Sequence, residues 1–292
     1  FLPLALGEML RRRGYRGHIT VGGPFAPLAR AWLLERYGWL DSVVRFAGEV
    51  PLVALTRRVL GAGPADGVGG VTTRAGDGSP APVLDDTPTR LCPERGALPT
   101  ILGLPTAHVA ASRGCRGRCH YCGPAALQTL ERAEGRRAGA TLAMLDDCGV
   151  GGIRRREIEA LADEMSALWH DRGVRYFYFV DEHLLPYAEP EALVFLRQWR
   201  AALARRRVGR LGIGAMLRPD RLTPAVVAEL AELGMVRAFV GLELASAAEG
   251  RAFGRAPPGD AEVELVRVFG RHGIATVSNL MLVHPGSTPE SV

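Results

Sequence analysis

The chain has 292 residues, of which 47% are hydrophobic and 23% are charged, a balance typical of a folded, water-soluble protein. Its formal net charge of +5 comes from separate arginine runs without interleaved aromatic residues, which favours solvated helix faces over a nucleic-acid surface. No apolar run approaches the ~20 residues that span a bilayer. Five cysteines, three of them clustered, favour a metal centre in a reducing compartment over a disulfide framework, so we expect a cytoplasmic protein.

The first sixty residues alternate between helical and extended patterns. Helices are predicted over residues 3–13, 26–37 and 51–59, and short strands over 18–21 and 42–46. The first strand ends in Gly22-Gly23, and the second is followed by Gly48-Glu49. Strand, glycine turn and helix at this pitch indicate an α/β segment with a parallel sheet.

Residues 61–105 lack hydrophobic periodicity and are rich in glycine and proline. This composition predicts a linker, with one hairpin within residues 69–83. Cys92 lies in this linker, away from the other cysteines, and we assign it no role.

Three cysteines lie within eight residues, Cys115, Cys119 and Cys122, in the spacing C-x3-C-x2-C. A short apolar segment over residues 106–111 leads into them. Three thiolates on one loop can bind three irons of a cubane [4Fe-4S] cluster and leave the fourth iron open to a small molecule. The alternative is a zinc site completed by His108 or His120, although zinc motifs usually pair two C-x2-C knuckles and this sequence has one.

This motif resembles the signature of the radical S-adenosylmethionine (radical SAM) enzymes. The resemblance rests on the cysteine spacing, on residues 112–115 at the end of a strand, and on the aromatic Tyr121 before the last cysteine. In that family the open iron binds S-adenosylmethionine, and electron transfer from the cluster cleaves it to a 5′-deoxyadenosyl radical. The resemblance implies that the three cysteines hold the cluster, that Tyr121 lies near the adenine, and that a donor such as flavodoxin or ferredoxin supplies electrons.

From residue 106 onward the sequence alternates strands and helices at βα spacing. Five strands are predicted over residues 106–111, 175–180, 210–215, 237–240 and 275–283, with helices between them and an irregular segment over 124–152. Right-handed crossovers curl such units into a partial parallel barrel. The family core is a (β/α)6 partial barrel, so we expect an incomplete barrel of this type over residues 106–292, in a chain truncated at both ends.

Residues 1–60 are similar to the C-terminal half of the Rossmann-like cobalamin-binding domain that precedes many radical SAM cores. In that domain a Gly-Gly pair lets the backbone approach the nucleotide tail of cobalamin, and Gly22 and Gly23 occupy the matching position. Gly48-Glu49 matches the pair after the following strand. The motif D-x-H-x-x-G, whose histidine can ligate cobalt, does not occur in this sequence, so cobalamin binding is implied by the fold resemblance alone.

Polar residues follow the predicted barrel strands at the ends where barrels of this kind hold their sites. Asp181 and Glu182 follow the second strand and suit the amino group of S-adenosylmethionine. By resemblance, Arg218 after the third strand faces the carboxylate, and Glu243 after the fourth faces the ribose or the amino end. The alternative for Arg218 is a local salt bridge with Asp220.

These features predict a radical SAM enzyme acting on an unidentified small molecule and, if cobalamin is bound, a C-methyltransferase. Radical rearrangement, cyclisation and methylthiolation are alternative reactions. Methylthiotransferases carry extra N-terminal cysteines, and none precedes Cys92. A zinc- or nucleic-acid-binding module is the alternative from a different class of protein.

Overall fold

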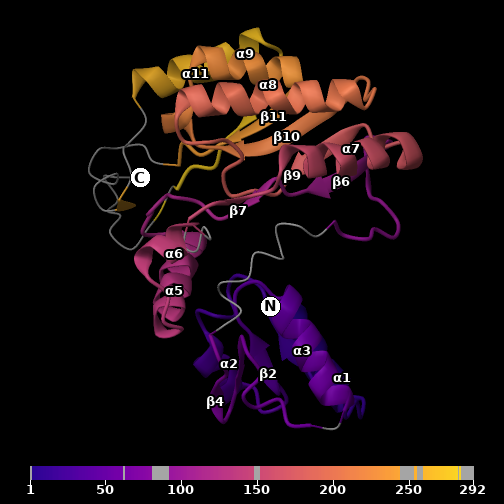
Figure 1. Cartoon of the computed structure of the whole chain (residues 1–292), viewed down its shortest axis with the longest axis vertical. Coiled ribbons are helices and arrows are strands. Elements are labelled where there is room, and N and C mark those ends of the chain that lie inside the picture. Colours follow the sequence, from indigo (N-terminus) through magenta and orange to yellow (C-terminus); the bar gives the residue numbers. More distant parts are fainter. Residues whose placement is uncertain are drawn as a thin grey trace. The chain divides into compact units, whose positions relative to one another are not determined.

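The computed structural model describes residues 2–61, 63–80, 92–147, 152–243, 253–254, 259–281 and 283. The chain divides into two compact units (Figure 1). The first contains residues 1–91, 115–117 and 121–154, and the second contains residues 92–114, 118–120 and 155–292. Among the described residues, no helix combines the length and the apolar character needed to cross a membrane.

A four-stranded sheet forms the centre of the first unit, in the order β1-β2-β3-β4. Strands β1 (Thr20–Val21) and β2 (Ser42–Val44) are parallel, while β3 (Val71–Thr73) and β4 (Gly76–Asp77) add as an antiparallel hairpin. The accompanying helices are α1 (Leu2–Arg12), α2 (Arg30–Arg36) and α3 (Glu49–Leu60). The predicted helices, parallel strands and hairpin are therefore confirmed, and the hairpin belongs to the sheet.

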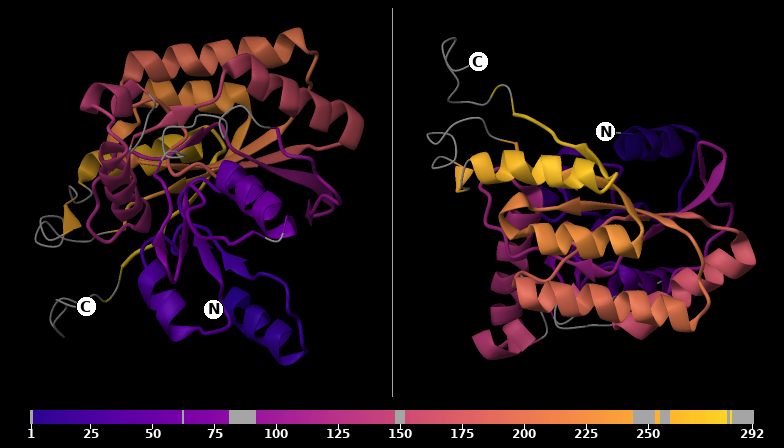
Figure 2. Two further views of the ribbon diagram at one scale, coloured as in Figure 1. Left: turned by 60° about the horizontal axis from the view of Figure 1, so that its bottom comes forward. Right: turned by 90° about the horizontal axis from the view of Figure 1, so that it is seen from above.

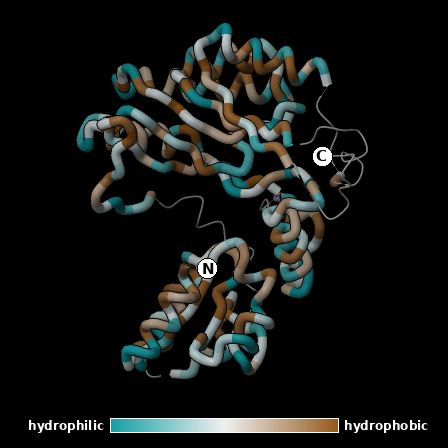
Figure 3. Tube along the Cα trace, turned by 180° about the vertical axis from the view of Figure 1, so that it is seen from behind, coloured by the Kyte–Doolittle hydropathy of each residue, from teal (hydrophilic) through white to brown (hydrophobic). Residues whose placement is uncertain are grey.

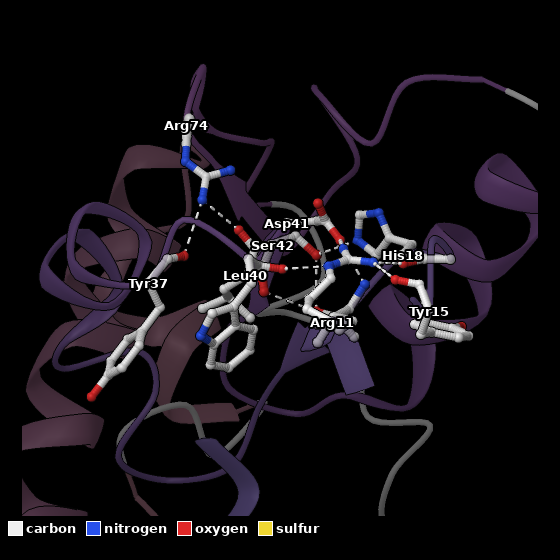
Figure 4. A network of polar contacts seen from close by, with 12 residues as sticks. Arg11, Tyr15, His18, Tyr37, Leu40, Asp41, Ser42 and Arg74 are labelled. Carbon is white, nitrogen blue, oxygen red and sulfur yellow. Dashed lines mark hydrogen bonds and ion pairs between the residues drawn. The ribbon is translucent and has the colours of Figure 1, made fainter. Parts of the chain in front are cut away.

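Arg11, at the end of α1, ties together the segments that lead into β1 and β2 (Figure 4). Its guanidinium donates to the carbonyl oxygens of Trp39 (3.2 Å) and Gly17 (2.6 Å) and pairs with the Asp41 carboxylate at 2.5 Å. Asp41 also accepts the backbone N–H of Ile19 at 2.7 Å. One arginine thus satisfies backbone carbonyls that would otherwise lack partners at the entrance of both strands.

Residues 123–147 contain two helices of the first unit, α5 (Gly123–Arg137) and α6 (Leu142–Asp147). The prediction of an irregular segment over 124–152 is therefore wrong. Gly135 lies inside α5, where a Cβ atom would approach the Leu145 side chain to 2.4 Å, so this glycine permits close helix packing and does not break the helix. Gly139, with φ +86°, follows α5 in the left-handed conformation.

A buried ion pair joins the sheet of the first unit to α5. Arg45, directly after β2, donates to both carboxylate oxygens of Glu134 at 2.6 Å and to the carbonyl of Gly78 at 2.7 Å. The two charged side chains are 2% and 5% exposed. Such a pair is costly to break, because the buried Arg45 charge would keep only a longer contact with Asp77, at 3.6 Å.

The second unit is built on a six-stranded sheet in the order β12-β11-β10-β9-β6-β5. Five strands are parallel: β6 (Leu104–Val109), β9 (Tyr176–Phe179), β10 (Gly212–Leu217), β11 (Met235–Val240) and β12 (Ala275–Val277). Strand β5 (Thr100–Ile101) pairs antiparallel with β6. The five predicted barrel strands are confirmed, although β12 is shorter than expected.

Helices α7 (Ile158–Arg172), α8 (Glu189–Arg205), α9 (Pro224–Leu233) and α11 (Asp260–Arg271) lie along one side of this sheet (Figure 2). Alternate strand residues such as Phe177 and Phe179 are fully buried in the core between sheet and helices, together with Trp199 of α8. Along the helices apolar and polar residues alternate, as expected when one face is buried (Figure 3). This arrangement is the predicted partial parallel (β/α)6-type barrel.

Three short elements complete the described chain: β7 (Ser112–Arg113), β8 (Arg154–Arg155) and the 3-10 turn η2 (Pro219–Arg221). Strand β7 leads into the cysteine loop, and η2 follows the end of β10. Thr223 caps α9 by accepting the N–H of Val226 at 3.3 Å, with Pro224 at the first helical position.

Candidate functional site

The cysteine loop begins after β7 and ends at α5. Cys115 and Cys122 are partly exposed, Cys119 is buried, and none of the three forms a disulfide bond. Gly114 adopts φ +90°, which lets the chain turn before the first cysteine. Cys122 directly precedes the N-terminus of α5, where the helix dipole favours a negative charge. Cys92 is exposed, and Cys148 lies outside the described residues.

Two acidic residues after β9 hold the start of this loop. The Asp181 carboxylate is 1% exposed and accepts the N–H of Ala111 (3.0 Å) and the hydroxyl of Ser112 (2.6 Å). Burial raises the pKa of Asp181, and these hydrogen bonds partly offset the rise. Glu182 is exposed and accepts the N–H of Gly114 at 3.0 Å. The structure thus brings both predicted acids to the cysteine loop, and their contact with S-adenosylmethionine stays a prediction.

Arg218 follows the last residue of β10 and reaches one of the cysteines. Its Nε and Nη2 donate to the two oxygens of Asp220 at 3.0 and 3.1 Å, so the local salt bridge considered from the sequence is present. Its Nη1 lies 3.6 Å from the Cys119 Sγ. Burial alone would lower the pKa of Arg218, but its hydrogen bonds with Asp220 and Cys119 raise it above the ordinary value.

Glu243 lies beyond β11 in a strained backbone conformation, with φ +60°. Its N–H donates to the carbonyl of Asn279 (3.1 Å), and its own carbonyl accepts the N–H of Met281 (2.8 Å). These bonds fix the residue at the ends of the parallel strands, which is the edge predicted for the site. Left-handed conformations at residues other than glycine occur often at functional sites.

His183 is completely buried and directly follows the two acids. Neither ring nitrogen has a hydrogen-bond partner among the described residues, and the ring makes an edge contact with Tyr187 at 4.9 Å. Burial, followed by the positive charges of Arg155 and Arg218, lowers the pKa of His183 to about 4. His183 is therefore a neutral imidazole at neutral pH. Its position directly after two acids at a strand end was the available sequence signal.

The remaining predicted site residues belong to the first unit. Gly22 and Gly23 are exposed directly after β1, and Gly23 has φ +93° with no atom within 4 Å of the position that a Cβ would take. The backbone there is open to the close approach of a ligand. Tyr121 is 37% exposed next to Cys122.

The part of the chain that the structure describes contains no group of three or more His, Cys, Asp or Glu side chains close enough to hold a metal ion. The metal-ligand assignment of the three cysteines therefore remains a prediction from their spacing. His108 packs edge-on against Tyr178 with ring centroids 5.8 Å apart, and the backbone N–H of His120 donates to the Phe253 carbonyl at 2.9 Å.

Residues 109–292 match the radical SAM superfamily. No curated protein is significantly similar in sequence. Among solved structures, the radical SAM methyltransferase TsrM from Kitasatospora setae is similar with a TM-score of 0.71 and 19% identity, covering 99% of this chain and 54% of TsrM. That structure contains a tryptophan substrate and a SAM analogue. A second TsrM structure, with cobalamin and a [4Fe-4S] cluster bound, is similar with a TM-score of 0.70 and 18% identity, covering 98% of this chain and 53% of TsrM.

The cobalamin-dependent SAM radical enzyme OxsB, with aqua-cobalamin and SAM bound, is similar with a TM-score of 0.61 and 15% identity, covering 95% of this chain and 38% of OxsB. The chain thus spans about half of TsrM and less than half of OxsB. At these identities the likeness concerns the fold, from the N-terminal sheet through the partial barrel. The family match is independent of it, covers most of the chain and includes all three clustered cysteines. The chain belongs to the radical SAM superfamily.

Proposed function

We propose that Cys115, Cys119 and Cys122 bind a [4Fe-4S] cluster and that the protein uses it to cleave S-adenosylmethionine reductively. The observation that carries this proposal is the C-x3-C-x2-C loop in the matched family region. When bound, the cluster supplies the electron that converts S-adenosylmethionine into methionine and a 5′-deoxyadenosyl radical, which abstracts hydrogen from the substrate.

The donors around the cysteines fit negatively charged thiolates. The backbone N–H of Gly117 points to the Cys115 Sγ at 3.2 Å, and Arg218 donates toward the Cys119 Sγ at 3.6 Å. Hydrogen bonds to ligand sulfurs are a general means by which proteins stabilise iron–sulfur clusters. A zinc site would need a fourth protein ligand or a bound water in addition to these thiols.

For S-adenosylmethionine, we assign the binding of its positively charged and hydroxylated parts to Glu182 and Glu243. Glu182 is exposed at the loop, and Glu243 lies at the strand ends in a fixed backbone conformation. Tyr121 offers a partly exposed ring for the adenine. Asp181 is 1% exposed and accepts hydrogen bonds from residues 111 and 112, so we assign it the positioning of the cysteine loop.

We further propose that the protein is a cobalamin-dependent C-methyltransferase. The fold likeness to TsrM and OxsB and the open backbone at Gly22 and Gly23 support this reaction over rearrangement, cyclisation and methylthiolation. The methyl acceptor is a small molecule, and a reduced flavodoxin or ferredoxin of the cytoplasm supplies the electrons. Free thiols of this kind persist in reducing compartments.

Gly22→Val tests the cobalamin part of this proposal. A Cβ at residue 22 would meet only Val44, at an ordinary 3.6 Å, so the sheet should tolerate the side chain while a cofactor tail loses its close approach. We expect Gly22→Val to bind hydroxocobalamin about tenfold more weakly than the wild-type protein, a loss of ~1.4 kcal/mol that titration measures. Equal affinities of the two proteins would contradict the approach of cobalamin to Gly22 and leave the cluster unaffected.

Anaerobic reconstitution with iron and sulfide tests the cluster. Wild-type protein and the control Cys92→Ala should take up iron and sulfide in the proportions of a [4Fe-4S] cluster. Alanine at Cys115, Cys119 or Cys122 should each abolish this uptake, because each removes one of only three protein ligands. Colourless wild-type protein that binds stoichiometric zinc instead would contradict the proposal.

A further inference from the structure

The guanidinium of Arg218 contacts both an aspartate and a cysteine. Two of its nitrogens, Nε and Nη2, bind Asp220 at 3.0 and 3.1 Å, and the third, Nη1, lies 3.6 Å from the Cys119 Sγ. A guanidinium is planar, so the bidentate contact with Asp220 fixes the direction of the remaining N–H groups. The arginine is therefore held with its free edge toward the sulfur.

The environment of this contact strengthens its electrostatic effect. The Arg218 side chain is 17% exposed and Cys119 is 7% exposed, so water and salt screen the interaction only weakly. One-electron reduction makes an iron–sulfur cluster more negative. A charged donor directed at a ligand sulfur favours the reduced state and raises the reduction potential.

We propose that Arg218, oriented by Asp220, donates a hydrogen bond to the cluster ligand Cys119 and thereby makes the cluster easier to reduce. This inference rests on the proposed function, because it requires the cluster. It makes Arg218 a positioning residue that acts through Cys119, whereas the sequence suggested direct binding of the S-adenosylmethionine carboxylate.

The negative charge of Asp220 partly neutralises the positive charge of Arg218 beside Cys119. It also pairs with Arg221, whose Nε lies 3.4 Å from Asp220 Oδ2 and whose guanidinium lies over the Tyr187 ring at 5.3 Å. Removing the negative charge of Asp220 leaves the positive charge beside Cys119 uncompensated. Substitutions of Arg218 and of Asp220 should therefore shift the potential in opposite directions.

The test is a redox titration of the reconstituted holoprotein, followed by electron paramagnetic resonance in the absence of S-adenosylmethionine. Arg218→Met should lower the equilibrium constant for one-electron reduction about tenfold, which corresponds to ~59 mV toward more negative potential. Arg218→Lys keeps the positive charge but lacks the planar guanidinium, so its reduction potential should lie between those of Arg218→Met and the wild type. Asp220→Asn should shift the potential upward, and the matched control Arg221→Met should shift it far less than Arg218→Met.

A wild-type potential in fully loaded Arg218→Met would overturn the inference, as would a downward shift in Asp220→Asn. If Arg218→Met does not retain its cluster, Arg218→Lys decides by the same criterion. Weaker S-adenosylmethionine binding by Arg218→Met at an unchanged reduction potential would show instead that Arg218 binds the carboxylate of S-adenosylmethionine. These outcomes differ from failure of the proposed function, in which the wild-type protein itself would assemble no cluster.

Discussion

The buried residue His183 makes the stability of the folded protein depend on pH. Its ring is excluded from water, the positive charges of Arg155, Arg218 and Arg221 lower its pKa, and the negative charge of Asp220 raises it. Burial contributes most to the lowered pKa, because it disfavours the charged form of the imidazole. The folded protein therefore binds this proton less readily than the unfolded chain does.

The sign of the resulting pH dependence follows from linkage. As the pH falls below 6.5 the unfolded chain takes up the proton, while folded His183 does so only near pH 4. The contribution of His183 to stability is therefore full above pH 6.5 and is lost as the pH approaches 4, a difference of about 3 kcal/mol. Roughly 2 kcal/mol of this contribution to stability is lost between pH 7 and pH 5.

Urea denaturation of cluster-free protein at pH 7 and pH 5 measures this effect. His183→Phe keeps a ring and removes the titrating group, so the variant should lose less stability than the wild type between the two pH values. The exposed His170 on α7 provides the control, since His170→Gln should retain the wild-type difference. An identical pH dependence in wild type and His183→Phe would show that another group is responsible.

Single residues were predicted where spacing alone defines the chemistry. The three cysteines follow from C-x3-C-x2-C, and the acids at 181 and 182 follow from their place after a strand. Which groups those acids bind depends on residues about 70 positions earlier in the chain, and no local pattern encodes that. The same holds for Arg218 and Cys119, which are 99 residues apart.

At the scale of elements, α5 connects the cysteine loop to the N-terminal sheet. The helix begins directly after Cys122 and carries Glu134, which forms the buried pair with Arg45. This buried ion pair links α5 to the sheet within the first unit. Removing Glu134 would leave the buried Arg45 charge with a longer contact to Asp77, at 3.6 Å.

Glu134→Gln should lower the free energy of unfolding by about 3 kcal/mol, because Gln keeps the shape of the side chain and leaves the buried Arg45 charge with the more distant Asp77 carboxylate, 3.6 Å away. The control lies in the adjoining helix: Asp146 pairs with Arg132 of α5, with side chains 66% and 31% exposed. Asp146→Asn should change stability by less than about 1 kcal/mol. Urea denaturation measures both, and equal effects of the two substitutions would contradict the role of burial.

Elements were predicted correctly where apolar residues recur at helical or strand spacing, as in α1, α7, α8, α9 and the barrel strands. They were missed over residues 124–147, where glycines suggested an irregular chain. The structure gives the reason, because Gly135 is required by the contact of α5 with Leu145 and does not terminate the helix. A glycine selected for close packing cannot be distinguished by sequence pattern from one that ends a helix.

At the scale of the whole molecule, the regular alternation of strands and helices allowed the architecture to be predicted. Parallel strands joined by helices permit few topologies, so five strands alternating with four helices were sufficient to indicate a partial barrel. The N-terminal sheet was indicated in the same way. The hairpin β3–β4 joins that sheet through pairing with β2, a non-local contact that local turn signals could not reveal.

Formation of 5′-deoxyadenosine tests the central claim most directly, namely that the three cysteines hold a cluster that cleaves S-adenosylmethionine. Reconstituted protein is incubated anaerobically with S-adenosylmethionine and dithionite, and the nucleoside is quantified by mass spectrometry. We predict 5′-deoxyadenosine from the wild type and from Cys92→Ala, and none from Cys119→Ala. Cluster-loaded wild-type protein that forms no 5′-deoxyadenosine, or undiminished formation by Cys119→Ala, would contradict the claim.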